Sequence, residues 1–256
     1  MPERVIVIGD VHGCLDELQT LVEKLGVHPG DSVILIGDLM DRGPDPVGCI
    51  QFARQSGFFG VLGNHDEKHL RWRRHEDRRA ADPSYQNPMR PLPPNRLSAN
   101  EALTAEDVAW LKCLPPVLDF YPGWIAVHGG LFPKHNLDAQ VFDAKMRDKL
   151  LRLRWIDDQG ESVPVESDTD PNGPSESKSW MEIYDGPFNV VYGHAVHSLS
   201  TPRVDERPQG VKTCGIDTGC CFGGRLTALV IEGSKTEFVQ VVAKRAYSDP
   251  PFPLSP

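Results

Sequence analysis

Three short apolar runs in the first quarter of the chain each end in a glycine-bounded polar loop and are followed by a segment that favours a helix. The loops are residues 9–13 (Gly-Asp-Val-His-Gly), 37–43 (Gly-Asp-Leu-Met-Asp-Arg-Gly) and 63–66 (Gly-Asn-His-Asp). Three such units in succession predict parallel strands joined by right-handed crossovers, with helices on the faces of the sheet. Because the carboxyl ends of parallel strands share one edge, the three polar loops should meet there.

The hydrophobic pattern and the turn residues place the other elements. Strands are predicted at residues 4–8, 32–36, 58–62, 117–120, 124–127, 152–156, 189–192, 211–216, 226–231 and 237–242. Helices are predicted across residues 15–25, 46–55 and 104–113, in the basic segment after Asp66, and ending near Leu150. The strands at 211–216, 226–231 and 237–242 are predicted to pair antiparallel in a second sheet. Residues 157–179, which are polar and rich in Pro, Gly and Ser, are predicted to form a surface loop.

Composition and charge exclude several classes of protein. The 256 residues, 39% hydrophobic and 25% charged, are typical of a folded protein, and no apolar run approaches the roughly 20 residues that cross a bilayer. A formal charge of -9 argues against a dedicated nucleic-acid binder. The first residues lack the pattern of a signal peptide, and the six cysteines form no paired zinc motif, so we expect a cytoplasmic protein with reduced thiols.

We expect one domain over residues 1–247 and an extended Pro-rich tail over residues 248–256. The helix after Asp66 carries six basic side chains, Lys68, Arg71, Arg73, Arg74, Arg78 and Arg79. This charge is either a solvated face or an arm that brings positive charge to a polyanionic substrate.

Five strand ends deliver side chains that bind metals: Asp10, His12, Asp38, Asn64, His128 and His194. Mixed oxygen and nitrogen donors without sulfur favour manganese, with iron, zinc, cobalt and nickel as alternatives, over calcium. Six ligands exceed what one catalytic zinc uses, and a carboxylate such as Asp38 can bridge two ions about 3.5 to 4 Å apart. A water between the two ions would be acidified to hydroxide near neutral pH.

Other residues with possible chemistry are interpreted as structural or left open. The structural histidines are His28, His69, His75 and His135, whereas His197 is undecided. Cys220 and Cys221 are interpreted as small buried thiols in a Gly-rich turn rather than as a vicinal disulfide or a redox sensor. Asp217 either makes a structural turn or lies near the site.

The order of these loops, completed by His-Gly-Gly at 128–130 and Gly-His at 193–194, resembles the calcineurin-like metallophosphoesterases, specifically their phosphoprotein-phosphatase branch. The resemblance covers residues 4 to about 243. Within that branch, residues 216–227 resemble a segment of the bacterial diadenosine tetraphosphate hydrolases and their bacterial phosphatase relatives. The resemblance implies an α/β fold, a four-layer αββα sandwich of two mixed sheets, with a dinuclear metal centre at the strand ends.

The resemblance also implies the metal ligands: Asp10 and His12 for one ion, Asn64, His128 and His194 for the other, and Asp38 as the bridge.

The resemblance further implies that His65 protonates the leaving oxygen while Asp41 orients it, and that Arg42 clamps the phosphoryl oxygens. The family supplies a second phosphate-binding arginine, for which Arg154 is nominated and Arg152 is nearly as good a choice.

The leading hypothesis is a manganese-dependent hydrolase of dinucleoside polyphosphates such as diadenosine tetraphosphate. The alternative is a protein serine/threonine phosphatase with the same centre, so the expected partner is a nucleotide or a phosphoprotein, with neither nucleic acid nor membrane. A third hypothesis, a silent metal-binding scaffold, leaves the joint presence of His65, Asp41 and Arg42 unexplained, because none of them adds to metal affinity.

Overall fold

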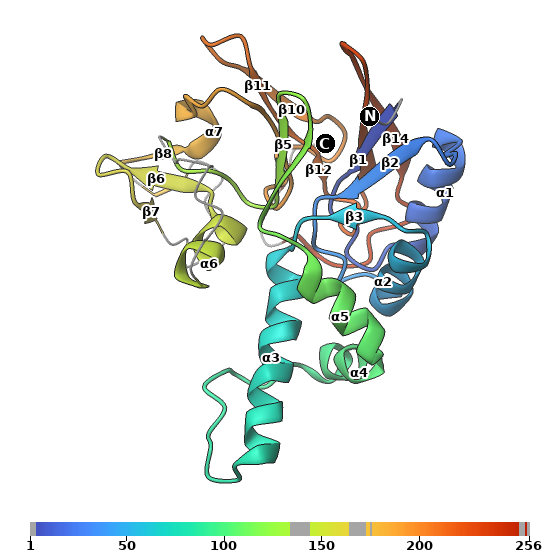
Figure 1. The fold of residues 1–256 in the computed structure, drawn as a ribbon, viewed down its shortest axis with the longest axis vertical. Helices are drawn as coiled ribbons and strands as arrows, with labels where there is room; N and C mark the ends of the chain where they lie inside the picture. Colours follow the sequence, from blue (N-terminus) through green and yellow to red (C-terminus); the bar gives the residue numbers. More distant parts are fainter. Residues whose placement is uncertain (1–3, 134–143, 164–172, 175, 251–253, 255–256) are drawn as a thin grey trace.

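Two large β-sheets pack face to face and carry helices on their outer faces (Figure 1). The computed structural model describes residues 4–133, 144–163, 173–174, 176–250 and 254. Within these residues, no helix is both long enough and apolar enough to cross a membrane.

The first sheet has six strands and contains the predicted parallel unit. Its order is β12-β13-β1-β2-β3, with β14 on the other side of β13. The strands are β1 (Arg4–Ile8), β2 (Asp31–Leu35), β3 (Phe59–Gly60), β12 (Asp217–Thr218), β13 (Arg225–Glu232) and β14 (Lys235–Val242). Strands β1, β2 and β3 run parallel, as predicted, and β13 pairs antiparallel with β1 from Val5 to Ile8.

The second sheet has five strands in the order β10-β11-β9-β5-β4. The strands are β4 (Val117–Tyr121), β5 (Trp124–Val127), β9 (Asn189–Tyr192), β10 (Arg203–Glu206) and β11 (Lys212–Gly215). It is also mixed, because β5, β9 and β11 are parallel neighbours whereas β4 and β10 are antiparallel edges.

Alternation along the strands divides the apolar side chains between two cores. On β1, Val5 and Val7 point into the space between the sheets, where they meet a cluster that includes Trp124 of the second sheet. Ile6 and Ile8 point the other way, onto a cluster formed with α1 (Leu15–Leu25) and α2 (Pro46–Gln55). Since all four side chains are fully buried, a one-residue slip of β1 would exchange the two faces, and the register is therefore strongly specified.

The outer face of the second sheet is covered by α6 (Ala144–Arg152), α7 (Trp180–Ile183) and a small third sheet (Figure 1). That sheet has the order β7-β6-β8, from β7 (Ser162–Val163), β6 (Trp155–Asp157) and β8 (Ser177–Ser179). Trp180 is fully buried, and its ring meets that of Tyr192 edge-on with the centroids 5.0 Å apart. The layers are therefore helix, sheet, sheet and helix, which confirms the predicted αββα sandwich.

Three helices form an arm on one side of this sandwich (Figure 1). They are α3 (Asn64–Ala81), α4 (Pro94–Ala102) and α5 (Ala105–Cys113). Helix α5 begins with a capping box, in which Thr104 accepts from the amide of Asp107 and the Asp107 carboxylate accepts from the amide of Thr104. Helix α3 begins at Asn64, before the predicted start, and α4 was not predicted.

Three sequence predictions were wrong. Strands β13 and β14 belong to the first sheet, because β13 fills the edge of β1 that the parallel unit leaves open, and only β11 lies in the second. Residues 152–156 are not one strand, since Arg152 ends α6. Residues 157–179 are more than a surface loop, because β7 and β8 within them pair with β6. His135 and most of the predicted tail lie outside the described residues.

Candidate active site

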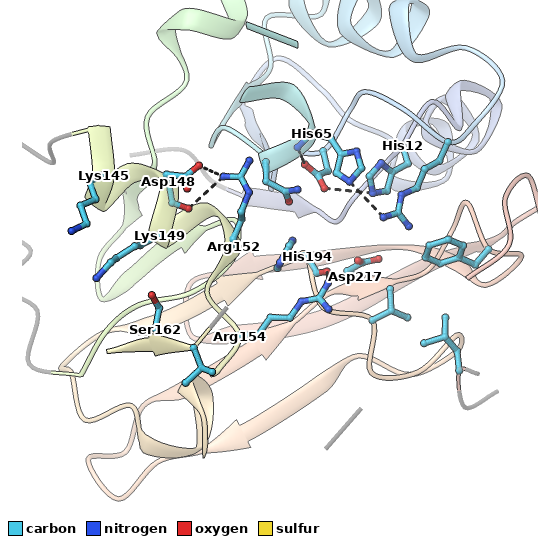
Figure 2. Close-up of a pocket in the computed structure, with 17 residues that line it drawn as sticks. His12, His65, Lys145, Asp148, Lys149, Arg152, Arg154, Ser162, His194 and Asp217 are labelled. Carbon is cyan, nitrogen blue, oxygen red and sulfur yellow. Dashed lines mark hydrogen bonds and ion pairs between the residues drawn. The ribbon is translucent and has the colours of Figure 1, made fainter. Parts of the chain in front are cut away.

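The segments that follow β1, β2 and β9, the start of α3, and helix α6 line one cavity of about 510 Å³. Figure 2 shows the side chains that line it. His12, Asp38, Asn64 and His194 line this cavity. Asp10 and His128 lie next to it and are buried, with 3% and 0% of their surface exposed. The structure therefore brings together all six side chains that the sequence analysis nominated as metal ligands, while their role as ligands stays a prediction.

The backbone of the site is held in a conformation that L-residues rarely adopt. Among the described residues, six non-glycine residues have a positive φ, and five of them are nominated site residues. Their φ angles are 44° at His12, 49° at Asp38, 72° at Asp41, 70° at Arg42 and 64° at His194. Each such residue costs about 1 kcal/mol or more, so the surrounding structure must impose the conformation.

Hydrogen bonds between the loops at residues 9–13 and 37–43 help to impose this backbone conformation. The amide of His12 donates to the carbonyl of Asp38 at 2.8 Å, and the amide of Gly43 donates to the carbonyl of His12 at 2.8 Å. Asp66, at the start of α3, accepts from the amides of Leu39 and Met40, each at 3.0 Å. The loops at residues 9–13 and 37–43 are thus hydrogen-bonded to each other, and the second is also hydrogen-bonded to α3.

The tautomers of two histidines follow from backbone contacts. Nδ1 of His12 lies 2.9 Å from the carbonyl of Met40, and Nδ1 of His128 lies 2.9 Å from the carbonyl of Ile36. Because a carbonyl only accepts, each Nδ1 carries the hydrogen, and each Nε2 can offer its lone pair. The Nε2 atoms lie 3.5 Å and 3.3 Å from the two carboxylate oxygens of Asp38.

These atoms form a site that favours a positive charge. Nε2 of His128 is also 2.9 Å from Oδ1 of Asn64, so lone pairs of three residues converge on one point. Burial lowers the pKa of His128, but the charge and hydrogen bond of Asp38 outweigh it and raise that pKa overall. Either a proton or a metal ion at Nε2 would satisfy this geometry.

Asp10 gives the clearest sign that this region suits a cation. Its Oδ2 accepts from the amide of His194 at 3.1 Å, whereas its buried Oδ1 has no hydrogen-bond partner among the described residues. Burial, followed by the charges of Asp217 and Asp38, raises the pKa of Asp10 well above its usual value. Three buried carboxylates therefore share a small region, and divalent cations would offset their repulsion.

Two overlapping groups of donor atoms fit metal ions. His12, Asp38 and His65 place one donor atom each within 4.8 Å of the others, and so do Asp38, His128 and His194. Asp38 belongs to both groups, as a bridging carboxylate must. The donors are nitrogen and oxygen, which suits divalent transition ions, so the residues present fit a dinuclear centre.

His65 has its Nδ1 occupied by a partner other than a metal. That atom lies 2.6 Å from Oδ2 of Asp41, and its Nε2 is turned toward the cavity, 3.5 Å from Nη2 of Arg42. Burial raises the pKa of Asp41, but hydrogen bonds from His65 and His69 reverse this and hold the pKa far below its usual value. An ionised Asp41 fixes the ring of His65 with one nitrogen presented to the cavity, the arrangement of a general acid and its orienting group.

Five cationic side chains line the same cavity: Arg42, Lys145, Lys149, Arg152 and Arg154 (Figure 2). The guanidinium of Arg42 lies 4.8 Å from the ring centroid of Phe222, a cation–π contact that holds it in place.

The two arginines that the sequence could not separate are held differently. Nη2 of Arg154 donates to the carbonyl of His194 at 3.1 Å, beside the metal-type ligands. Arg152 pairs with Asp148 and lies 3.4 Å from the carboxylate of Glu67.

Sequence reasoning missed three residues that line the cavity or contact its residues. Lys145 and Lys149 reach the cavity from α6, and the alternation of charge in that helix gave no sign of its location. His69, interpreted as structural, places Nε2 2.9 Å from Oδ1 of Asp41.

The structure places the residues whose roles the sequence analysis left undecided. Asp217 makes the turn, since it accepts from the amide of Gly219 at 3.0 Å, and it also lines the cavity. His197 does not line the cavity; its Nε2 is 3.4 Å from the hydroxyl of Tyr192, and burial lowers its pKa to about 4. Cys220 and Cys221 are buried free thiols, as interpreted from the sequence. Cys14, Cys49 and Cys214 are also buried and free, and Cys113 is exposed.

The αββα sandwich, with nitrogen and oxygen donor atoms gathered at its strand ends, fits a metal-dependent hydrolase, and residues 3–212 match the calcineurin-like phosphoesterase family. The chain belongs to this family, and the resemblance found in its sequence is confirmed. It is therefore a hydrolase of the metallophosphoesterase class.

Among curated proteins, the chain is similar to the symmetrical bis(5'-nucleosyl)-tetraphosphatase of Yersinia enterocolitica, with 30% identity over 93% of this chain and 91% of the relative. The enzyme of the same name from Yersinia pestis is 29% identical over 87% of each chain.

Among solved structures, one assigned provisionally as a diadenosine tetraphosphatase matches with a TM-score of 0.70 and 25% identity over 94% of both chains. A protein serine/threonine phosphatase from Saccharomyces cerevisiae matches with a TM-score of 0.51 and 16% identity, over 98% of this chain and 82% of that one, and so shares the fold.

Proposed function

We propose that this protein hydrolyses dinucleoside polyphosphates such as diadenosine tetraphosphate, with two divalent ions bound at the described site. One observation carries the proposal: four of the nominated metal ligands and five cationic side chains line the same cavity of about 510 Å³. A phosphate monoester carries at most two negative charges, whereas a tetraphosphate chain carries one on each of its four phosphates. Relatives named as symmetrical bis(5'-nucleosyl)-tetraphosphatases support the same substrate.

In this proposal Asp10 and His12 hold one ion, Asn64, His128 and His194 hold the other, and Asp38 contacts both. When bound, the two ions would offset the charge of the phosphoryl oxygens and lower the pKa of a water molecule. Manganese is the proposed metal, because the donors combine carboxylate, amide and imidazole; iron, zinc, cobalt and nickel suit them next.

The chain's own residues position the substrate and supply a proton. Arg42, held over Phe222, offers two parallel N–H groups to the phosphoryl group, a geometry that matches phosphate oxygens. Arg154 is the proposed second phosphate ligand, since its contact with the carbonyl of His194 keeps it beside the metal-type residues. His65 donates a proton from Nε2 to the leaving oxygen, and Asp41 orients the ring.

A protein serine/threonine phosphatase is the second candidate, and one observation favours it. An alkoxide is a poorer leaving group than a nucleotide, so the pair of His65 and Asp41 is needed more for phosphoserine than for a phosphoanhydride.

The first experiment compares turnover of diadenosine tetraphosphate and of a phosphoserine peptide by the manganese-loaded protein, with separation of the nucleotide products. We expect the dinucleotide to be preferred and ADP to be the only product. A preference for the peptide would make the protein a signalling phosphatase, and products of ATP and AMP would show asymmetric cleavage.

The proposed bridge is tested by Asp38→Ala. We expect turnover to be lost and metal content to fall, because Asp38 belongs to both groups of donor atoms. Full metal occupancy in this variant would show that Asp38 is not the bridge.

The two arginines are separated by Arg154→Met and Arg152→Met. We expect the first to raise KM for the tetraphosphate by about 10-fold or more and the second to change it much less, because Arg152 already pairs with two carboxylates. The reverse order would assign the phosphate contact to Arg152.

We also propose that one catalytic domain spans residues 1–247, since strand β14 of the first sheet ends at Val242. A cytoplasmic location is supported by the six free cysteine thiols.

A further inference from the structure

Asp41 receives hydrogen bonds from two histidines on the same helix. Oδ2 is 2.6 Å from Nδ1 of His65, and Oδ1 is 2.9 Å from Nε2 of His69, one turn further along α3. The guanidinium of Arg96, on α4, lies 3.3 Å from Oδ2. Both carboxylate oxygens are therefore occupied, and the orientation of Asp41 is fixed from two sides.

The hydrogen on His69 can be located from its neighbours. Nδ2 of Asn100 lies 3.1 Å from the carbonyl oxygen of His69 and 3.0 Å from its Nδ1. Since the carbonyl only accepts, the amide group of Asn100 facing it must be the NH₂ donor. Nδ1 of His69 is then the acceptor, and the hydrogen lies on Nε2, directed at Asp41.

Water cannot replace these partners, because the network is buried. His69 is fully buried, Asn100 is 3% exposed and Asp41 is 4% exposed. The end of α4 is held against α3 by Arg73, which donates to the carbonyls of Asn100 and Leu103. Loss of the His69 donor would leave a buried carboxylate oxygen unpaired, a costly state that the side chain would escape by rotating.

We propose that His69, with its tautomer fixed by Asn100, is a positioning residue for the acid step. It holds Asp41 in the orientation that presents Nε2 of His65 to the leaving group, and the inference rests on the proposed role of His65. In that step the oxygen of water bonds to phosphorus, and the bond from phosphorus to the leaving oxygen breaks with its electron pair on that oxygen. The Nε2 proton of protonated His65 then neutralises the leaving oxygen.

The consequence is a selective effect on substrates. A nitrophenolate leaves without much help from an acid, whereas a serine alkoxide needs the proton. A residue that acts through His65 should therefore affect the second substrate more than the first. A residue that only packs the helices should affect both equally.

The test uses the manganese-loaded variants His69→Leu and His69→Gln with p-nitrophenyl phosphate and a phosphoserine peptide. We expect His69→Leu to lower kcat on the peptide by roughly 10- to 100-fold and on the nitrophenyl ester by less than about 3-fold. His69→Gln, which can place an amide N–H where Nε2 stood, should recover much of the loss. His75→Leu is the matched control, because His75 is on the same helix and contacts Tyr85 away from the cavity, and it should leave both rates unchanged.

A second comparison repeats His69→Leu in a His65→Asn background. If His69 acts through His65, the second substitution should add less than about 2-fold to the loss on the peptide, since the two effects belong to one unit. Equal losses on the two substrates, or a full additional loss in the His65→Asn background, would overturn the proposal. If His69→Leu does not fold, the test uses His69→Gln alone. A His69→Gln variant that loses the substrate preference of the wild type would then overturn the proposal.

The outcome is separable from that of the proposed function. A wild-type protein that does not cleave diadenosine tetraphosphate would refute the proposed substrate, whereas the His69 comparison uses monoesters and the wild-type rates on them as its reference.

Discussion

Removal of metal should lower the melting temperature of this protein by a predictable amount. Asp10, Asp38 and Asp217 are 3%, 2% and 6% exposed, and burial, followed by the charges of the other two, raises the pKa of Asp10. Ions that bind only the folded chain stabilise it by about 2.7 kcal/mol each when their free concentration is 100 times the dissociation constant.

The shift in melting temperature follows from the length of the chain. The entropy of unfolding is roughly 2.1 cal/mol/K per residue, which gives about 0.5 kcal/mol/K for 256 residues. Each ion should then raise the melting temperature by about 5 °C, and two ions by about 10 °C. The assay is scanning calorimetry of chelator-treated, dialysed protein titrated with manganese chloride.

The variant Asp10→Asn tests this prediction further, because its effect on the melting temperature should differ in sign between the metal-free and the metal-loaded protein. In Asp10→Asn the carboxylate, whose Oδ1 has no hydrogen-bond partner among the described residues, becomes a neutral amide. The metal-free variant should therefore melt at the same temperature as the metal-free wild type or higher. The metal-loaded variant should melt lower than the loaded wild type. Asp119→Asn, which removes the same charge from an exposed position on β4, should leave the metal response unchanged. A wild type with no metal-dependent shift, or a metal-free Asp10→Asn that melts several degrees lower, would refute the electrostatic reasoning.

Three further predictions concern other parts of the chain. Gly193→Ala should abolish metal binding with the fold retained, because the added Cβ would lie 2.0 Å from Oδ1 of Asp10; metal analysis and circular dichroism test this. Thr104→Ala should cost about 1 kcal/mol through loss of the α5 cap, measured by urea unfolding, with turnover unchanged. Hydrogen bonding to Arg4 lowers the pKa of Asp31 below its unfolded value of about 3.9, so this pair stabilises the fold above that pH and less as pH falls. Asp31→Asn should therefore be about 1 kcal/mol less stable than wild type at pH 7, and urea curves at a series of pH values should show the difference shrinking toward pH 3.5.

The site could be predicted because its signals are local. Each nominated ligand follows an apolar run and lies beside a glycine, so the strand and the turn can be recognised within about ten residues of sequence. Parallel strands then place their ends together without further information. Helix α2 and the cap of α5 were likewise encoded in neighbouring residues.

What could not be predicted depends on partners distant in sequence. The apolar alternation of β13 identifies a strand but not its neighbour, so its assignment to the second sheet was wrong. His69 is four residues after His65 and shares its helix face, yet nothing in that spacing shows that Asp41 lies opposite both. Helix α4 has few apolar residues, and its location depends on the contact between Arg73 and its last turn.

The pairing of β1 with β13 has a consequence for how the chain folds as it is synthesised. Val5 pairs with Ile231, and the amide of Gly9 donates to the carbonyl of Thr227. Strand β1, the first to be synthesised, therefore cannot complete its pairing until β13, one of the last, has been made. Contacts of such sequence separation slow folding, because the loop must close before the contact forms. Until residue 232 has left the ribosome, one edge of β1 lacks its partner, and a chain that stops short of β13 leaves that edge open and prone to pair with other chains.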